Sequence, residues 1–178
     1  MANTTFSGPV RSKNGFINTG PGAVKALTLA TDLTVADHAG RLITMDPAGT
    51  PTAITIPSII STADAAVAGA SDPNNASTIG TTFEILFIDN FTGTIKTANT
   101  ADKFVGAVTL GITASTAGKQ FQVATNNNEV NLIGEAGTAT TGGLKGSIIK
   151  FTAIAANLYA VEGQLPAAGV LATPFDNQ

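Results

Sequence analysis

Charged side chains are scarce in this 178-residue chain. Asp, Glu, Lys and Arg make up 12% of the residues, about half of the roughly 25% that is usual in soluble globular domains. Cysteine and tryptophan are absent, and there is one histidine. A disulfide framework, a cysteine-ligated zinc site and a multi-histidine metal site within one chain are therefore excluded. The net charge of −3 and the pI of about 4.9 argue against a nucleic-acid-binding domain. No apolar run approaches the ~20 residues that cross a bilayer, so no membrane partner is expected.

Alanine, threonine and glycine take the place of charge, with 29, 27 and 19 residues. The chain is still 43% hydrophobic and has nine phenylalanines, which is enough to bury a core in one domain. Threonine favours strands and presents a hydroxyl group without a charge. A weakly charged surface of this kind loses little desolvation energy on packing against another protein. Composition alone is equally consistent with assembly and with a neutral, solvated surface.

The few bases are unevenly placed. Residues 1–26 contain Arg11, Lys13 and Lys25 and no acid, so this stretch carries +3 and the remainder carries −6. Its apolar residues are isolated, so neither a helix nor a strand is predicted. We interpret residues 1–26 as an extended N-terminal arm: either a disordered tail or a segment that orders on an acidic partner. Residues 164–178 have two prolines and no periodicity, and predict a C-terminal arm.

The region between the arms, residues 27–163, has the pattern of short strands separated by turn residues. An all-β domain is expected, a single compact sandwich or barrel of about nine strands with at most one short helix, at 61–69. Residues 82–89 are apolar on both faces near their end, which predicts a central strand, and 94–97 is the expected hairpin partner. The nine predicted strands lie within 41–46, 52–57, 82–89, 94–97, 104–110, 120–124, 129–133, 146–153 and 157–161.

No catalytic, cofactor or metal site emerges from the sequence, so no enzyme activity is expected. His38 is interpreted as a polar loop residue, because a Ser-His-Asp arrangement needs geometry that the sequence does not supply. The stretch 137–146 has the glycines of a phosphate loop but lacks the Lys and Ser/Thr after the second glycine. Six carboxylates are candidates for a glycoside-cleaving pair, but they are interpreted more simply as turn residues or as the polar ends or solvent sides of strands: Glu84, Asp89, Asp102, Glu129, Glu135 and Glu162.

Several short motifs resemble a family of small virion structural proteins of tailed bacteriophages. The opening stretch Ala2–Phe16 is similar to the N-terminus of such proteins. The resemblance continues over the body. Leu33–Arg41 resembles the opening strand and Gly turn of these proteins, Thr55–Pro57 a strand that ends in an apolar residue and Pro, and Asp102–Gly106 their middle segment. Gly146–Phe151 and Asn157–Gly163 resemble their closing hairpin, in which Tyr159 stands where many relatives have Trp. The motifs span nearly the whole chain, but each is short.

The resemblance implies a capsid decoration (cement) protein, made in the bacterial host cytoplasm and carried on the exterior of the virion. The implied partners are the major capsid protein and further copies of the chain, often as a homotrimer. The resemblance carries no catalytic residues. The expected capsid contacts are six arm residues: Phe6, Val10, Arg11, Lys13, Phe16 and Ile17. The alternative is a head-fibre or tail-associated receptor-binding module.

Overall fold

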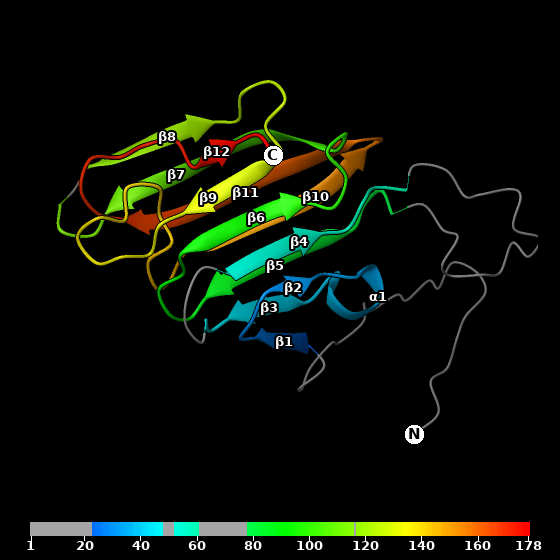
Figure 1. The fold of residues 1–178 in the computed structure, drawn as a ribbon, viewed down its shortest axis with the longest axis horizontal. Coiled ribbons are helices and arrows are strands. Elements are labelled where there is room, and N and C mark those ends of the chain that lie inside the picture. The colour runs from blue at the N-terminus through cyan, green and yellow to red at the C-terminus, as the bar shows by residue number, and fades with distance from the viewer. Residues whose placement is uncertain (1–22, 48–51, 61–77, 116) are drawn as a thin grey trace, which may run out of the picture.

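Two β-sheets lie face to face in the computed structural model of this chain, which describes residues 23–47, 52–60, 78–115 and 117–178 (Figure 1). The all-β prediction is confirmed. The seven-stranded sheet has the order β1-β3-β5-β10-β11-β7-β8, with strands β1 (Val24–Leu27), β3 (Leu42–Met45), β5 (Thr82–Phe87), β10 (Ile148–Ala155), β11 (Leu158–Ala167), β7 (Lys103–Ile112) and β8 (Gly118–Gln122). The five-stranded sheet has the order β12-β9-β6-β4-β2, with strands β12 (Phe175–Asp176), β9 (Glu129–Leu132), β6 (Gly93–Thr97), β4 (Thr52–Ile56) and β2 (Thr31–Asp32).

The first half of the chain winds between the two sheets. Strands β1, β3 and β5 lie in one sheet and β2, β4 and β6 in the other, so each strand pairs with the next but one along the chain. These pairings are parallel, because every connection crosses to the opposite layer before the chain returns. Antiparallel pairing appears later, most clearly in the β10–β11 hairpin, which the family resemblance implied at 146–151 and 157–163.

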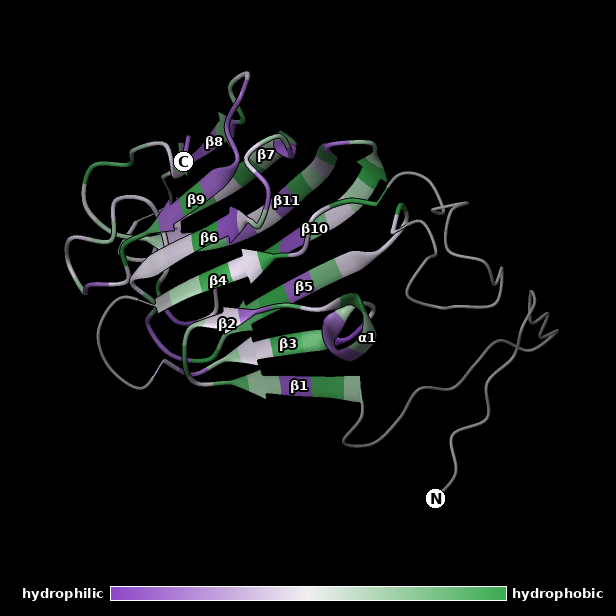
Figure 2. Ribbon diagram, turned by 45° about the vertical axis from the view of Figure 1, so that its right-hand side comes forward, coloured by the Kyte–Doolittle hydropathy of each residue, from purple (hydrophilic) through white to green (hydrophobic). Residues whose placement is uncertain are grey.

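The core fills the space between the layers. On β5, Phe83, Ile85 and Phe87 point inward and alternate with partly exposed residues, as expected for strands with one buried face. Hydrophobic and hydrophilic bands follow one another along several strands in Figure 2. The position of β5 between β3 and β10 confirms the central-strand prediction. Opposing residues of the five-stranded sheet include Ile54 and Ile95, both fully buried. Each such side chain contributes about 1.5–3 kcal/mol on burial, so packing between the two layers stabilises the sandwich.

One predicted connection was wrong. Residues 94–97 do not form a hairpin with 82–89, because β6 lies between β4 and β9 in the other sheet. The link between β5 and β6 carries Phe91 into the core, where its ring centroid lies 4.6 Å from that of Phe87. Burying this ring directs the chain across the sandwich instead of back along the same sheet.

The expected arm boundaries also need correction. Residues 24–26 belong to β1, an edge strand of the seven-stranded sheet. At the other end, β11 continues to Ala167 and β12 pairs with β9, so residues 164–178 are part of the sandwich and not an arm. Leu165, Ala167 and Phe175 are buried there, which supplies the physical reason for the difference.

The described helix is α1, a single turn over Val35–His38. Its N-terminus is capped by Thr34, whose hydroxyl accepts a hydrogen bond from the amide of Asp37. The helix expected at 61–69 lies outside the described residues.

Candidate interaction surface

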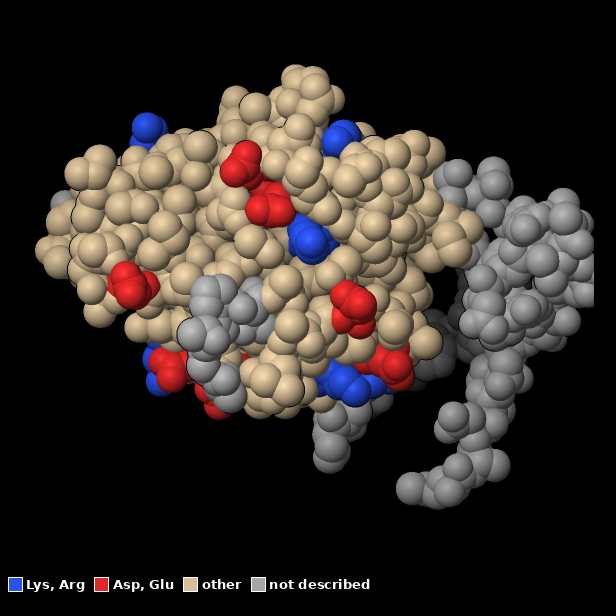
Figure 3. Space-filling model, viewed as in Figure 1, with Lys and Arg blue, Asp and Glu red and all other residues tan. Residues whose placement is uncertain are grey.

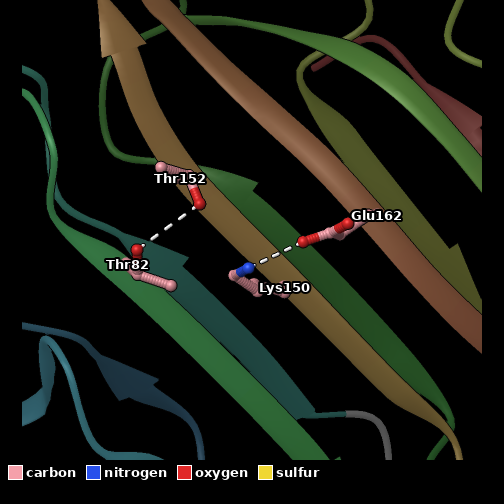
Figure 4. Close-up of polar contacts among 4 residues, drawn as sticks. All are labelled: Thr82, Lys150, Thr152 and Glu162. Carbon is pink, nitrogen blue, oxygen red and sulfur yellow. Dashed lines mark hydrogen bonds and ion pairs between the residues drawn. The ribbon is translucent and has the colours of Figure 1, made fainter.

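A row of charged side chains crosses the outer face of the seven-stranded sheet. Lys150 on β10 lies in register with Glu84 on β5 and with Glu162 on β11. The Lys150 Nζ and Glu162 Oε1 atoms are 2.7 Å apart, and the two side chains point toward each other in Figure 4. Hydrogen bonding to Glu162 raises the pKa of Lys150. Two carboxylates therefore flank one ammonium, and this row carries a net charge of −1.

Small polar and aliphatic residues surround this row. Leu42 lies next to Glu84 across the sheet, and Leu86 pairs with Ile148 one step along the strands. These side chains are partly exposed, and Val105, farther across the sheet, is 43% exposed. The outer face thus combines a small charged centre with an extended apolar border.

A shallow groove of about 530 Å³ runs across this face. Its lining residues come from five adjacent strands, β5, β10, β11, β7 and β8, and the polar ones are Glu84, Thr109, Gln120, Lys150, Glu162 and Gln164. A second hollow of about 330 Å³ shares Thr109, Ile148 and Gln164 with the groove and extends toward the Gly111 end of β7. The two hollows therefore adjoin each other on this face.

The outer face of the five-stranded sheet is different in character. Strand pairing aligns Asp32, Thr55, Lys96, Glu129 and Asp176 across it. At the outward positions described on its strands, no aliphatic side chain is larger than alanine. Figure 3 shows this face as mostly uncharged, with a few acidic and basic side chains. The apolar border is therefore a property of one sheet face, and the two faces are not equivalent.

The six predicted arm residues, Phe6, Val10, Arg11, Lys13, Phe16 and Ile17, lie outside the described residues. From the sequence, Glu84 and Glu162 are two of six carboxylates considered for glycoside cleavage and are interpreted more simply as polar ends or solvent sides of strands, and Lys150 is not singled out. The period-two burial of their strands places all three outward, which is a signal present in the sequence. Their alignment in one row depends on strand pairing, for which the sequence gives no direct signal.

His38 is not a loop residue as predicted. It lies in α1 and is buried, with Nδ1 accepting a hydrogen bond from the Thr34 amide at 3.0 Å. Burial lowers its pKa. The imidazole therefore has a local structural partner that accounts for its position.

Asp102 is a turn residue as predicted, but its side chain is fully buried. Its Oδ2 accepts a hydrogen bond of 3.1 Å from the Ile59 amide, and among the described residues its Oδ1 has no hydrogen-bond partner. Burial raises the pKa of this carboxyl, and the bond from Ile59 opposes that shift. Nearby, the Tyr159 hydroxyl donates to the Pro57 carbonyl oxygen. Asp102 and Tyr159 together fix the chain as it leaves β4.

The aromatic side chains of the described body point inward, with Phe121 partly buried and the others buried. Within the same residues, no group of three or more His, Asp or Glu side chains is arranged to hold a metal ion. None of the described helices is long and apolar enough to cross a membrane. Comparison of the chain with protein-family models, with curated proteins and with solved structures found no match.

Proposed function

We propose that this chain is a virion structural protein, a capsid decoration protein that binds the outside of a major capsid protein shell and stabilises it against the pressure of packaged DNA. In this proposal the N-terminal arm docks on the shell and the β-sandwich covers it. The chain acts in many copies, with a homotrimer as the proposed unit. Repetition around a shell multiplies the effect of each interface, because linked contacts strengthen one another.

The observation that carries this proposal is the outer face of the seven-stranded sheet. Its border of Leu42, Leu86, Ile148 and Val105 surrounds three charged side chains. Because interface centres are depleted in charge, since desolvating Lys and Glu is costly, the apolar border, and not the charged row, is the part of this face that suits the centre of an interface. The described core lies between residues 27 and 175, which supports a body whose packing is separate from the arm.

A receptor-binding module of a head fibre or tail is the second candidate. Binding sites for sugars commonly use exposed aromatic rings, and the described body has its rings buried or partly buried. This placement favours the decoration protein over a carbohydrate-binding module. The two functions also differ in copy number, with hundreds of copies per particle expected for decoration and a few tens or fewer for a tail part.

Binding to undecorated capsids tests the proposal. Deleting residues 2–20 should abolish co-sedimentation with the capsids while the circular dichroism and cooperative unfolding of the body remain. Replacing Arg11 and Lys13 with glutamine should weaken binding, with a stronger effect at low ionic strength. A matched variant, Lys119→Gln with Lys145→Gln, removes the same charge from the body and should bind normally. Retained binding by the truncated chain would refute the proposed role of the arm.

A further inference from the structure

The first strand of the seven-stranded sheet, β1, begins in the same cross-strand row as the charged side chains Glu84, Lys150 and Glu162. Val24, the first residue of β1, pairs with Leu42, and Leu42 pairs with Glu84. Glu84 in turn lies in register with Lys150, and Lys150 with Glu162. Val24 is two strands from Glu84, or about 10 Å at the usual strand spacing. Residues 1–22 therefore join the body beside the groove that contains these carboxylates.

The charge of residues 1–22 is opposite to that of the row. This N-terminal segment contains Arg11 and Lys13 and no acid. In the row, Glu84 and Glu162 share Lys150, which leaves one negative charge uncompensated. The Glu162 side chain is 69% exposed, so it is accessible to a second basic partner. Two bases one residue apart fall on the same side of an extended chain.

The dimensions of the groove also match a short piece of this segment. Five strands are separated by four spacings, which gives a length of about 19 Å and room for about six extended residues. The 11 residues from Lys13 to Val24 reach at most about 36 Å, which exceeds the distance to either glutamate. A tether of this length gives an effective concentration in the millimolar range. It therefore favours the chain's own body over a neighbouring copy at ordinary protein concentrations.

We propose that residues 10–15 dock in the groove on the outer face of their own seven-stranded sheet, with Arg11 and Lys13 beside Glu84 and Glu162. The contact exists in the free protein and needs no capsid. A further consequence rests on the proposed function: the capsid shell competes with the groove for Arg11 and Lys13. Binding to the shell then releases the segment from the groove and uncovers the apolar border of the sheet.

Tryptic cleavage after Arg11 and Lys13 reports the contact directly. Replacing both acids, Glu84→Gln with Glu162→Gln, should accelerate cleavage at these two bonds about three-fold or more, since the docked bases are released. Raising NaCl from about 20 mM to about 500 mM should accelerate cleavage of the native chain and leave the double variant nearly unchanged. The control is Glu129→Gln with Asp176→Asn, which removes two carboxylates from the opposite face. Equal cleavage rates in all three proteins would overturn the proposal.

A disulfide trap distinguishes the chain's own segment from that of another copy. Gly15 lies on the same side of an extended chain as Arg11 and Lys13. Since the chain has no cysteine, Gly15→Cys with Gln164→Cys should oxidise to an intramolecular disulfide in a monomer. Gly15→Cys with Thr94→Cys places the second thiol on the opposite face and should not close. Disulfide-linked dimers, or equal closure of both pairs, would contradict docking on the same body. Both assays are made without capsids. If they fail, the proposal that the arm binds capsids is unaffected; if capsid binding fails, the proposed contact between the arm and the groove is unaffected.

Discussion

The hydroxyl of Tyr159 on β11 donates a 2.7 Å hydrogen bond to the carbonyl oxygen of Pro57, which follows β4 in the opposite sheet. The ring is buried in the core and only its polar end reaches across to the second layer. This bond ties the two sheets together at the point where the chain leaves β4. Tyrosine suits the position because it supplies an apolar ring and a donor in one side chain.

Replacing Tyr159 with phenylalanine should lower the free energy of unfolding by about 1–2 kcal/mol, because the Pro57 carbonyl loses its donor while the ring remains. Urea denaturation at neutral pH measures the change. Thr82→Val provides a control, since it removes a hydroxyl whose 3.4 Å contact with Thr152 lies on the outer face (Figure 4). That variant should stay within about 0.5 kcal/mol of the native chain. Equal losses in the two variants would contradict a special role for the tie between sheets.

The tyrosine should also resist ionisation. Burial, and to a smaller extent the charge of Asp102, raise the pKa of Tyr159 well above its usual range. Tyr159 is the single tyrosine of the chain, so tyrosinate absorbance follows it without interference. In the folded protein no ionisation is expected near pH 10, where free tyrosine titrates. Ionisation should appear together with loss of the circular dichroism signal, and ordinary titration in denaturant serves as the control.

The strands could be predicted well from the sequence, but their partners could not. Short strand-forming runs bounded by turn residues predicted nine segments, and each of them overlaps a strand of the structure. The missed strands were β1, inside an apparent arm, and β2 and β12, which have two residues each. Such short strands offer too few alternating positions to produce a pattern. They are held by pairing with distant segments, as β12 is by β9.

Turn residues in the sequence predicted where the chain changes direction. They did not predict which of the two sheets the next strand joins. The link containing Asn90 and Gly93 has the composition of a hairpin, yet it crosses the sandwich because Phe91 is buried between the sheets. The same limit applies to the interaction surface. Period-two alternation placed Glu84 and Glu162 outward, but their alignment with Lys150 depends on long-range pairing. The expected capsid contacts lie outside the described residues and stay predictions.

Asp102 should give the protein an unusual dependence of stability on pH. Its pKa is raised by burial in the folded state, so the unfolded chain releases the proton more readily. The stabilising difference is fully present below the ordinary pKa of about 4 and is lost as pH rises through the folded value. Compared with Asp102→Asn, the native chain should therefore lose free energy of unfolding as pH rises from about 4 toward 7.

Denaturation of the native chain and of Asp102→Asn at several pH values measures this difference. Asparagine keeps an acceptor for the Ile59 amide and does not titrate, so it isolates the charge. Asp102→Ala removes the acceptor as well and should destabilise the protein at every pH, by about 1–3 kcal/mol. A constant difference between the native chain and the asparagine variant would show that the carboxyl does not titrate abnormally.

Gly106 on β7 should be irreplaceable by alanine, whereas Gly111 on the same strand should tolerate it. Gly106 has a φ of +123°, and a Cβ there would collide with the backbone carbonyl of its pairing partner Val161. At Gly111 a Cβ meets nothing within 4 Å. We expect Gly106→Ala to cost about 2–3 kcal/mol or more, from backbone strain and a displaced β7–β11 pairing. Gly111→Ala should be neutral or stabilise slightly, because it reduces the entropy of the unfolded chain.

Urea denaturation of the two variants compares one substitution at two places on a single strand. A similar loss at both would mean that Val161 does not approach Gly106 so closely and that the cost comes only from the residue type.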